Sequence, residues 1–292
     1  MTRKQVFLAI KAGLLPRIGY FIPGGGAPGV DMAMGEMRAL ERFGVVPCAL
    51  SGTSAGSQAS VCYAKVRNAA ACCEIVKAMP PNAVQSPRMP SWIPDWITKG
   101  ANLALNKPFY SNDKALALLR ANAPTIWNDI SLDLRMHSSM YDDDGCMEHL
   151  LTSADFATPA EAAMASMSIP WLFPDMVDLD GYHHIDGGVV CNVPIIDEWI
   201  TNLDHCFLLI PQTREADRPI RNTSNELDRL LHIFRGMLHA QVVRAVNNVA
   251  CADSVTVIWP DFVDNTSILT LNPVLIDQAD AFTTQFLQKD MT

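Results

Sequence analysis

The chain has 292 residues, of which 49% are apolar, and a formal charge of −9 from 31 acidic and 22 basic residues. This length and apolar content predict one large domain with a substantial core and exclude a disordered chain. The acidic balance, without a basic cluster, argues against nucleic acid as a partner and against charge-driven attraction to anionic membranes, so any lipid contact should be peripheral and apolar.

The first eleven residues combine basic and apolar side chains, but Lys11 interrupts the apolar run and no small-residue cleavage site follows. We therefore expect an N-terminal helix or arm rather than a signal peptide. Eight cysteines show neither disulfide-framework nor C-x-x-C spacing. This usage favours a reducing compartment, and we expect a cytoplasmic protein, with peripheral membrane association as the alternative. No apolar segment is long enough to span a membrane.

The first predicted strand, Ile18–Ile22, runs directly into the glycine-rich loop Pro23–Gly29. Apolar residues at helical spacing follow the loop, and they predict a helix. Backbone N–H groups in a run of glycines are uncovered, so they can approach a ligand closely. Two such groups can hold the negative oxygen of a tetrahedral intermediate. A phosphate-binding loop fits less well, because neither glycine pattern typical of such loops is complete.

A second predicted strand, Val45–Leu50, leads into Gly52-Thr53-Ser54-Ala55-Gly56, and a helical stretch follows. This is the strand–turn–helix context that a G-x-S-x-G nucleophile elbow requires. The turn exposes the serine hydroxyl, and the positive end of the following helix points at it. In isolation the pattern is weak, because a loop rich in small residues also produces it.

The stretch 79–127 interrupts the alternation of strands and helices with a proline-rich segment. It predicts either a lid-like insertion over the active site or an irregular connection packed on the core. In the lid interpretation, three apolar side chains meet the substrate, namely Met89, Trp92 and Trp96. Strand Leu132–Ser138 follows, and the acidic run at 142–144 before Gly145 predicts a hairpin turn rather than a calcium loop.

A short strand at Tyr182–Ile185 ends in Asp186-Gly187-Gly188. An aspartate at a strand end can face a serine on a neighbouring loop. Further strands are expected at Cys206–Ile210 and Val255–Trp259, with a long amphipathic helix at Asn225–Ala250 between them. Alternation of strands and helices predicts an α/β domain whose mainly parallel sheet is covered on both faces.

Together, the glycine-rich loop, G-x-S-x-G and Asp-Gly-Gly resemble the motifs of the patatin-like phospholipase family in type and order. The segment Ala165–Pro174 also resembles the family's small-residue helix end and Pro/Phe loop. The resemblance covers Arg17–Pro211. It implies a three-layer α/β/α sandwich in one catalytic domain, residues 1–292, with core motifs in 17–211 and a helical and strand extension in 212–292.

The resemblance implies a serine acyl hydrolase acting on lipid esters through a Ser–Asp dyad, without a metal or other cofactor. Ser54 would be the nucleophile and Asp186 the base. The oxyanion hole would come from backbone groups of Gly24, Gly25, Gly26 and Ala55. Substrate contacts would include Pro170 and Phe173 of the Pro/Phe loop.

In one place the chain departs from the family pattern, because Pro28 stands where the family usually has a basic residue. Losing that cation weakens the argument for an anionic phospholipid, so a lysolipid or a neutral acyl ester is an equal expectation. The alternatives are a short-chain carboxylesterase using the same dyad and a non-catalytic relative that binds lipid or a partner. Oligomeric state is left open.

A histidine triad is the mechanistic rival, since three histidines follow Asp186 in the Ser–Asp–His order of α/β-hydrolases. They are His205, His232 and His239. His205 precedes an apolar strand, and the other two lie in the long helical stretch. We interpret each as a structural histidine. No histidine or cysteine pattern has the spacing of a metal site.

Overall fold

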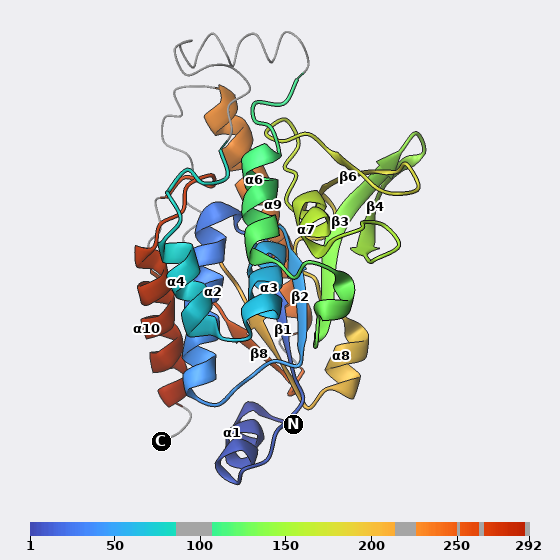
Figure 1. Ribbon diagram of the computed structural model, residues 1–292. Helices are drawn as coiled ribbons and strands as arrows, with labels where there is room; N and C mark the ends of the chain where they lie inside the picture. Colours follow the sequence, from blue (N-terminus) through green and yellow to red (C-terminus); the bar gives the residue numbers. More distant parts are fainter. Residues whose placement is uncertain (86–106, 214–225, 250–251, 263–265, 290–292) are drawn as a thin grey trace.

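The computed structural model describes residues 1–85, 107–213, 226–249, 252–262 and 266–289. Helices and strands alternate along this part of the chain (Figure 1). In chain order the elements are α1 (Arg3–Lys11), β1 (Ile18–Ile22), α2 (Gly26–Arg42), β2 (Ala49–Thr53), α3 (Ala55–Val66), α4 (Ala69–Lys77), α6 (Asp113–Asn122), the 3₁₀ turn η1 (Trp127–Asp129), β3 (Asp133–Asp142), β4 (Gly145–Leu151), α7 (Pro159–Ser166), β5 (Met176–Val177), β6 (His183–Asp186), the 3₁₀ turn η2 (Gly187–Val189), α8 (Asp197–Asn202), β7 (His205–Leu209), α9 (Glu226–Val249), β8 (Val255–Ile258) and α10 (Val274–Gln288).

The strands of the described residues form a single mixed sheet in the order β5-β6-β3-β2-β1-β7-β8, and β4 pairs with β3 off this path. Neighbours from β3 to β8 in this order run parallel. Strands β4, β5 and β6 pair antiparallel. The expected mainly parallel sheet is confirmed. Its antiparallel part consists of β4, β5 and β6, at the end of the sheet that begins with β3.

Alternate residues of β1 supply two different cores, because successive side chains of a strand point to opposite faces. Tyr20 and Ile22 pack with apolar residues of α2, α3, α4 and α10. Phe21 packs on the other face with residues of α8 and α9, stacking on Trp199. The three-layer α/β/α architecture is therefore confirmed, with helices on both sides of the sheet (Figure 1).

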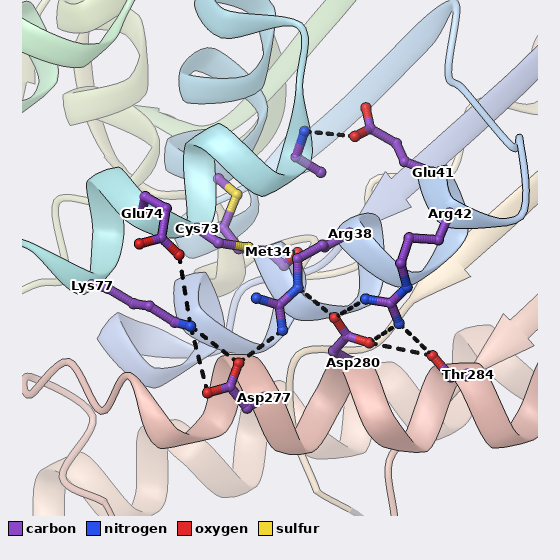
Figure 2. Close-up of polar contacts among 11 residues, drawn as sticks. Met34, Arg38, Glu41, Arg42, Cys73, Glu74, Lys77, Asp277, Asp280 and Thr284 are labelled. Atoms are coloured by element: carbon purple, nitrogen blue, oxygen red, sulfur yellow. Dashed lines mark hydrogen bonds and ion pairs between the residues drawn. The ribbon is translucent and has the colours of Figure 1, made fainter.

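Helices α2 and α10 are joined by the ion-pair network shown in Figure 2. Arg38 and Arg42 on α2 both bind Asp280, and Arg38 also binds Asp277 with an N–O distance of 2.8 Å. Lys77 of α4 reaches the same Asp277 at 3.1 Å. Burial raises the pKa of Asp280, but hydrogen bonds from Arg42 and Arg38 outweigh it and leave the pKa below its usual value. The C-terminal helix thus packs against the helix that follows the glycine-rich loop.

Most of the predicted elements are confirmed within a few residues, but β2 begins four residues later than expected. Pro47 has no N–H to donate to a sheet, so residues 45–47 lie outside the strand, and backbone hydrogen bonds to Ile18 and Asp133 begin at Cys48. Ser51 and Gly52 pair with both β1 and β3, and Thr53 pairs with β3; all three residues are buried. Strands β4 and β5 were not predicted, because β4 is mostly exposed and β5 has only two residues.

The N-terminal helix, the hairpin turn at 142–145 and the long helix are all confirmed, as α1, the β3–β4 connection and α9. Asp142 accepts hydrogen bonds from two backbone N–H groups of that turn. Met89, Trp92 and Trp96 lie outside the described residues, so the lid interpretation stays a prediction. Within the described part of the chain, no helix is long and apolar enough to cross a membrane.

Candidate functional site

Strand β3 brings the two predicted catalytic residues together. Its residue His137 is paired with Thr53 at the end of β2, and the next residue, Ser138, is paired with Asp186 at the end of β6. Both β2 and β6 lie on the same edge of β3, because β4 occupies the other edge from Met136 to Asp142, a range that overlaps both stretches. The last residue of β6 therefore lies beside Ser54, which directly follows β2.

Ser54 sits on a strained turn between β2 and α3, with φ 54° and ψ −117°. This positive φ is uncommon for a residue with a side chain, and it is typical of a nucleophile elbow. The turn lies against β1 so closely that a Cβ on Gly56 would stand 1.8 Å from the carbonyl oxygen of Ile22. The second glycine of G-x-S-x-G is thus required by contact between the start of α3 and β1.

The Ser54 hydroxyl donates a hydrogen bond to Asp186, with 2.6 Å between Oγ and Oδ2. The other carboxylate oxygen, Oδ1, accepts the N–H of Gly188 at 2.8 Å. Both side chains are almost completely buried. The aspartate is thus held in one orientation, in which Oδ2 accepts the hydrogen bond from Ser54. A base needs this geometry to remove the serine proton.

Burial raises the pKa of Asp186 to about 7, and hydrogen bonds from Ser54 and Gly188 oppose this shift. Its ordinary value is 3.8. A carboxylate with a pKa near neutrality is a stronger base than an exposed one, so burial makes the weak base of the dyad suited to removing a proton from an alcohol.

Because Asp186 must be ionised to accept a proton, we expect kcat/KM for a neutral ester to be level above pH 7 and to fall about tenfold per pH unit below it. The measurement is initial hydrolysis rate from pH 5 to 9, with circular dichroism at each pH to show that the protein stays folded. A flat profile between pH 5 and 8 would contradict Asp186 as the base.

The glycine-rich loop lies beside the dyad and opens α2. Gly26 is the first residue of that helix and has φ 69°, so its backbone favours glycine. Within the described residues, the N–H groups of Gly25, Gly26 and Ala55 donate no hydrogen bond. The first residues of α2 and α3 border the same pocket, and the N-termini of both helices favour negative charge. The arrangement suits an oxyanion, and its assignment stays a prediction.

A small pocket, partly open to solvent, borders Ser54, Ala55 and Gly26. Apart from Gln58, its remaining walls are apolar. They are formed by Ala27, Val84, Met167, Ile169, Phe173, Ile268 and Leu269. Phe173 lines this pocket and Pro170 does not, and substrate contact by either residue stays a prediction. Ile268 and Leu269 had no signal in the sequence, because they lie far from every motif.

The serine backbone is held by a residue of the small-residue segment. Ser166 at the end of α7 accepts the N–H of Ser54 at 2.9 Å, and it donates to the carbonyl oxygen of His137 at 2.6 Å. Ser166 is fully buried. Sequence reasoning gave this segment no role in holding the nucleophile.

The histidines of the rival triad lie elsewhere. His205 binds the backbone oxygen of Met1 and the hydroxyl of Thr256. His239 packs against Trp259, and His232 is exposed on α9. None of them has a hydrogen bond to the dyad in the part of the chain that is described. The same part contains no cluster of three side chains that could hold a metal ion.

Comparison with known proteins identifies one matching family and several similar structures. The model of a family described as patatin-like phospholipase matches residues 21–199. A search of curated proteins finds no match. Human GIVD cytosolic phospholipase A2 has a similar structure, with 10% identity, 99% of this chain and 63% of that chain covered, and a TM-score of 0.53.

VipD from Legionella pneumophila is also similar, with 14% identity, 94% of this chain and 67% of that chain covered, and a TM-score of 0.47. ExoU, solved in a heterodimeric complex with SpcU from Pseudomonas aeruginosa, has 16% identity, coverage of 94% and 52%, and a TM-score of 0.39. The chain thus spans between half and two thirds of the length of these three structures.

Proposed function

Because the chain belongs to the patatin-like phospholipase family, we propose that it is a serine acyl hydrolase that cleaves carboxylic esters of lipids through an acyl-Ser54 intermediate. The observation that carries the proposal is the 2.6 Å hydrogen bond from Ser54 to the buried Asp186 at the edge of an apolar pocket. An activated hydroxyl, an oriented base and free backbone donors are the groups that acyl transfer requires.

In the first half of the reaction, Ser54 Oγ attacks the ester carbonyl carbon while its proton passes to Asp186 Oδ2. The carbonyl oxygen takes the negative charge, and the N–H groups of Gly25 and Gly26, with that of Ala55, would stabilise it. When the intermediate collapses, the bond from the carbonyl carbon to the leaving oxygen breaks. Asp186 returns the proton to that oxygen, and the alcohol departs.

In the second half, water attacks the acyl-serine and gives its proton to Asp186. Collapse of this second intermediate releases the carboxylic acid, and Asp186 returns the proton to Ser54 Oγ. A dyad serves both halves, because the same carboxylate alternates between base and acid. No other titratable group is required between Ser54 and the substrate.

The walls of the pocket favour an acyl chain over an anionic head group. None of the described residues that line it is basic, and Pro28, which replaces the family's basic residue, is buried in the first turn of α2. The pocket therefore offers apolar contact without a counter-charge. We propose neutral acyl esters, lysolipids and zwitterionic phospholipids as substrates ahead of anionic phospholipids.

A serine-directed fluorophosphonate probe tests the nucleophile. We expect the wild-type protein to be labelled and Ser54→Ala not to be, because the probe reacts only with an activated hydroxyl. Ser60→Ala is the matched control, since Ser60 is a buried serine of α3, the helix that follows Ser54, and its hydroxyl has no hydrogen-bond partner within the described residues. It should be labelled like the wild type.

The same protein should hydrolyse p-nitrophenyl esters of several chain lengths, and phosphatidylcholine faster than phosphatidylglycerol vesicles. Activity confined to the acetyl and butyryl esters would favour the short-chain carboxylesterase alternative. Folded protein that neither reacts with the probe nor hydrolyses any ester would favour the non-catalytic alternative.

A further inference from the structure

Two buried amide side chains hold the peptide group between Gly24 and Gly25. The carbonyl oxygen of Gly24 accepts Nε2 of Gln212 at 2.6 Å and Nδ2 of Asn192 at 3.4 Å. The N–H of Gly24 donates to Oδ1 of the same Asn192 at 3.0 Å. Asn192 and Gln212 are 0% and 2% exposed, so these contacts are shielded from water. Neither residue belongs to the dyad or lines the pocket.

These contacts fix the direction of a predicted oxyanion donor. In a trans peptide the C=O and N–H bonds point in opposite directions. The carbonyl of Gly24 is turned toward Gln212 and Asn192, so the N–H of Gly25 in the same peptide must point away from them. That N–H donates to no group within the described residues. The Gly25 N–H therefore points to the side of the loop that faces away from Asn192 and Gln212.

The chemistry of Gln212 supports a role beyond packing. Its Oε1 is buried and has no hydrogen-bond partner among the residues that the structure describes. A buried amide oxygen without a partner is unfavourable, and an apolar side chain of the same size would avoid it. What distinguishes Gln212 from such a side chain is the Nε2 donor, which contacts Gly24.

The same cluster reaches the catalytic aspartate through α9. Gln241 accepts the backbone N–H of Asn192 at 2.6 Å and donates Nε2 to the carbonyl oxygen of Gly188 at 2.8 Å. Gly188 in turn donates its N–H to Asp186. A continuous chain of hydrogen bonds thus connects the glycine-rich loop with the loop that orients the base.

We propose that Asn192 and Gln212 are positioning residues, which orient the Gly24–Gly25 peptide so that the Gly25 N–H stabilises the oxyanion, with Gln241 coupling this orientation to the Asp186 loop. The inference rests on the proposed acyl hydrolase function. Preorganised donors act in the transition state more than in the ground state, so their loss lowers kcat and leaves KM nearly unchanged.

The test compares Gln212→Met, Gln212→Ala and the wild type in hydrolysis of p-nitrophenyl butyrate and in inhibition by an alkyl trifluoromethyl ketone, which forms an oxyanion adduct with a serine. We expect both variants to lose about 10- to 100-fold in kcat with KM within about threefold of the wild type. The inhibition constant should rise by the same factor. Methionine fills the volume of glutamine, so a packing role predicts that only the alanine variant is impaired.

Tyr20→Phe is the matched control, because Tyr20 also donates from a buried side chain to a backbone carbonyl, that of Val45 at 2.8 Å. It should keep kcat and the inhibition constant within about twofold of the wild type. Thermal unfolding identifies the temperature at which all variants are folded, and Gln212→Leu, which also lacks the donor and is close to glutamine in size, replaces Gln212→Met if the methionine variant does not fold. A Gln212→Met variant with wild-type kcat, or an unchanged inhibition constant in either variant, overturns the inference. An inactive wild-type protein that forms no ketone adduct instead overturns the proposed function.

Discussion

Replacing Asp186 by asparagine is expected to lower kcat by about 10³-fold or more, because the amide cannot accept the proton of Ser54. Asparagine keeps the shape of the side chain, and its Oδ1 can still accept the N–H of Gly188. The loss should therefore report chemistry rather than misfolding. Steady-state kinetics with p-nitrophenyl butyrate at pH 8 measures it.

The same substitution is expected to stabilise the protein at alkaline pH. The pKa of Asp186 is about 7 in the folded chain against 3.8 ordinarily, so the folded state binds an extra proton between these values. Wild-type stability consequently falls as the pH rises from 4 to 7, and the deficit persists above 7. At 1.36 kcal/mol per unit, Asp186→Asn removes a penalty of up to about 4 kcal/mol at pH 8.

Urea unfolding of the wild type and Asp186→Asn at pH 4 and pH 8 measures this gain, which should nearly vanish at pH 4. Asp178→Asn is the control, because we expect it to change the free energy of unfolding in the opposite direction. Burial raises the pKa of Asp178, but hydrogen bonds from His184 and Tyr182 outweigh it and leave the pKa below its ordinary value. Removing this charge should destabilise the protein at neutral pH. Equal stability of wild type and Asp186→Asn at pH 8 would contradict the raised pKa.

Gly56→Ala is expected to destabilise the protein by at least about 3 kcal/mol and to abolish labelling of Ser54. The new methyl group would stand 1.8 Å from the carbonyl oxygen of Ile22 and 3.0 Å from that of Pro23. Both are backbone atoms, so relief requires moving α3 away from β1. Such a movement displaces the turn that carries Ser54. Denaturant unfolding and probe labelling measure the two effects.

Gly236→Ala provides the matched control for the added methyl group. Gly236 lies exposed within α9, and nothing stands within 4 Å of a Cβ built there. Alanine favours a helix over glycine, so this variant should gain about 0.5–1 kcal/mol. If Gly56→Ala were as stable as the wild type, close contact between α3 and β1 would not be the reason for glycine at that position.

The sequence was most informative where a motif requires a particular backbone. Gly56 is required by close contact and Gly26 by its positive φ, and both constraints are visible in the sequence as glycine patterns that follow a predicted strand. Strand β1 was predicted at its observed bounds, because it is a continuous apolar run buried on both faces. The approach of Asp186 to Ser54 was also expected, from the position of each residue at a strand end.

Other parts of the site depend on contacts between distant segments, which a single sequence does not encode locally. Ile268 and Leu269 form a wall of the pocket, although the loop that carries them has no distinctive pattern. Gln212 and Gln241 belong to no motif in the sequence, and only the fold shows that they contact Gly24 and Gly188. The predicted start of β2 was wrong because the prediction relied on the apolar residues from Val45 and did not take into account that Pro47 has no N–H.

Pairing of β2 and β6 with consecutive residues of β3 has a consequence for the architecture as a whole. Ser54 and Asp186 are separated by 132 positions, yet their spacing is set by the neighbours His137 and Ser138. The connections on either side of β3 can therefore change in length at positions that do not contact the site, whereas Ser166 and the pocket residues in the β3–β6 connection must keep their places. We therefore expect that a chain divided at such a position gives two fragments that regain activity only when strand pairing reunites them, as in a complementation reporter.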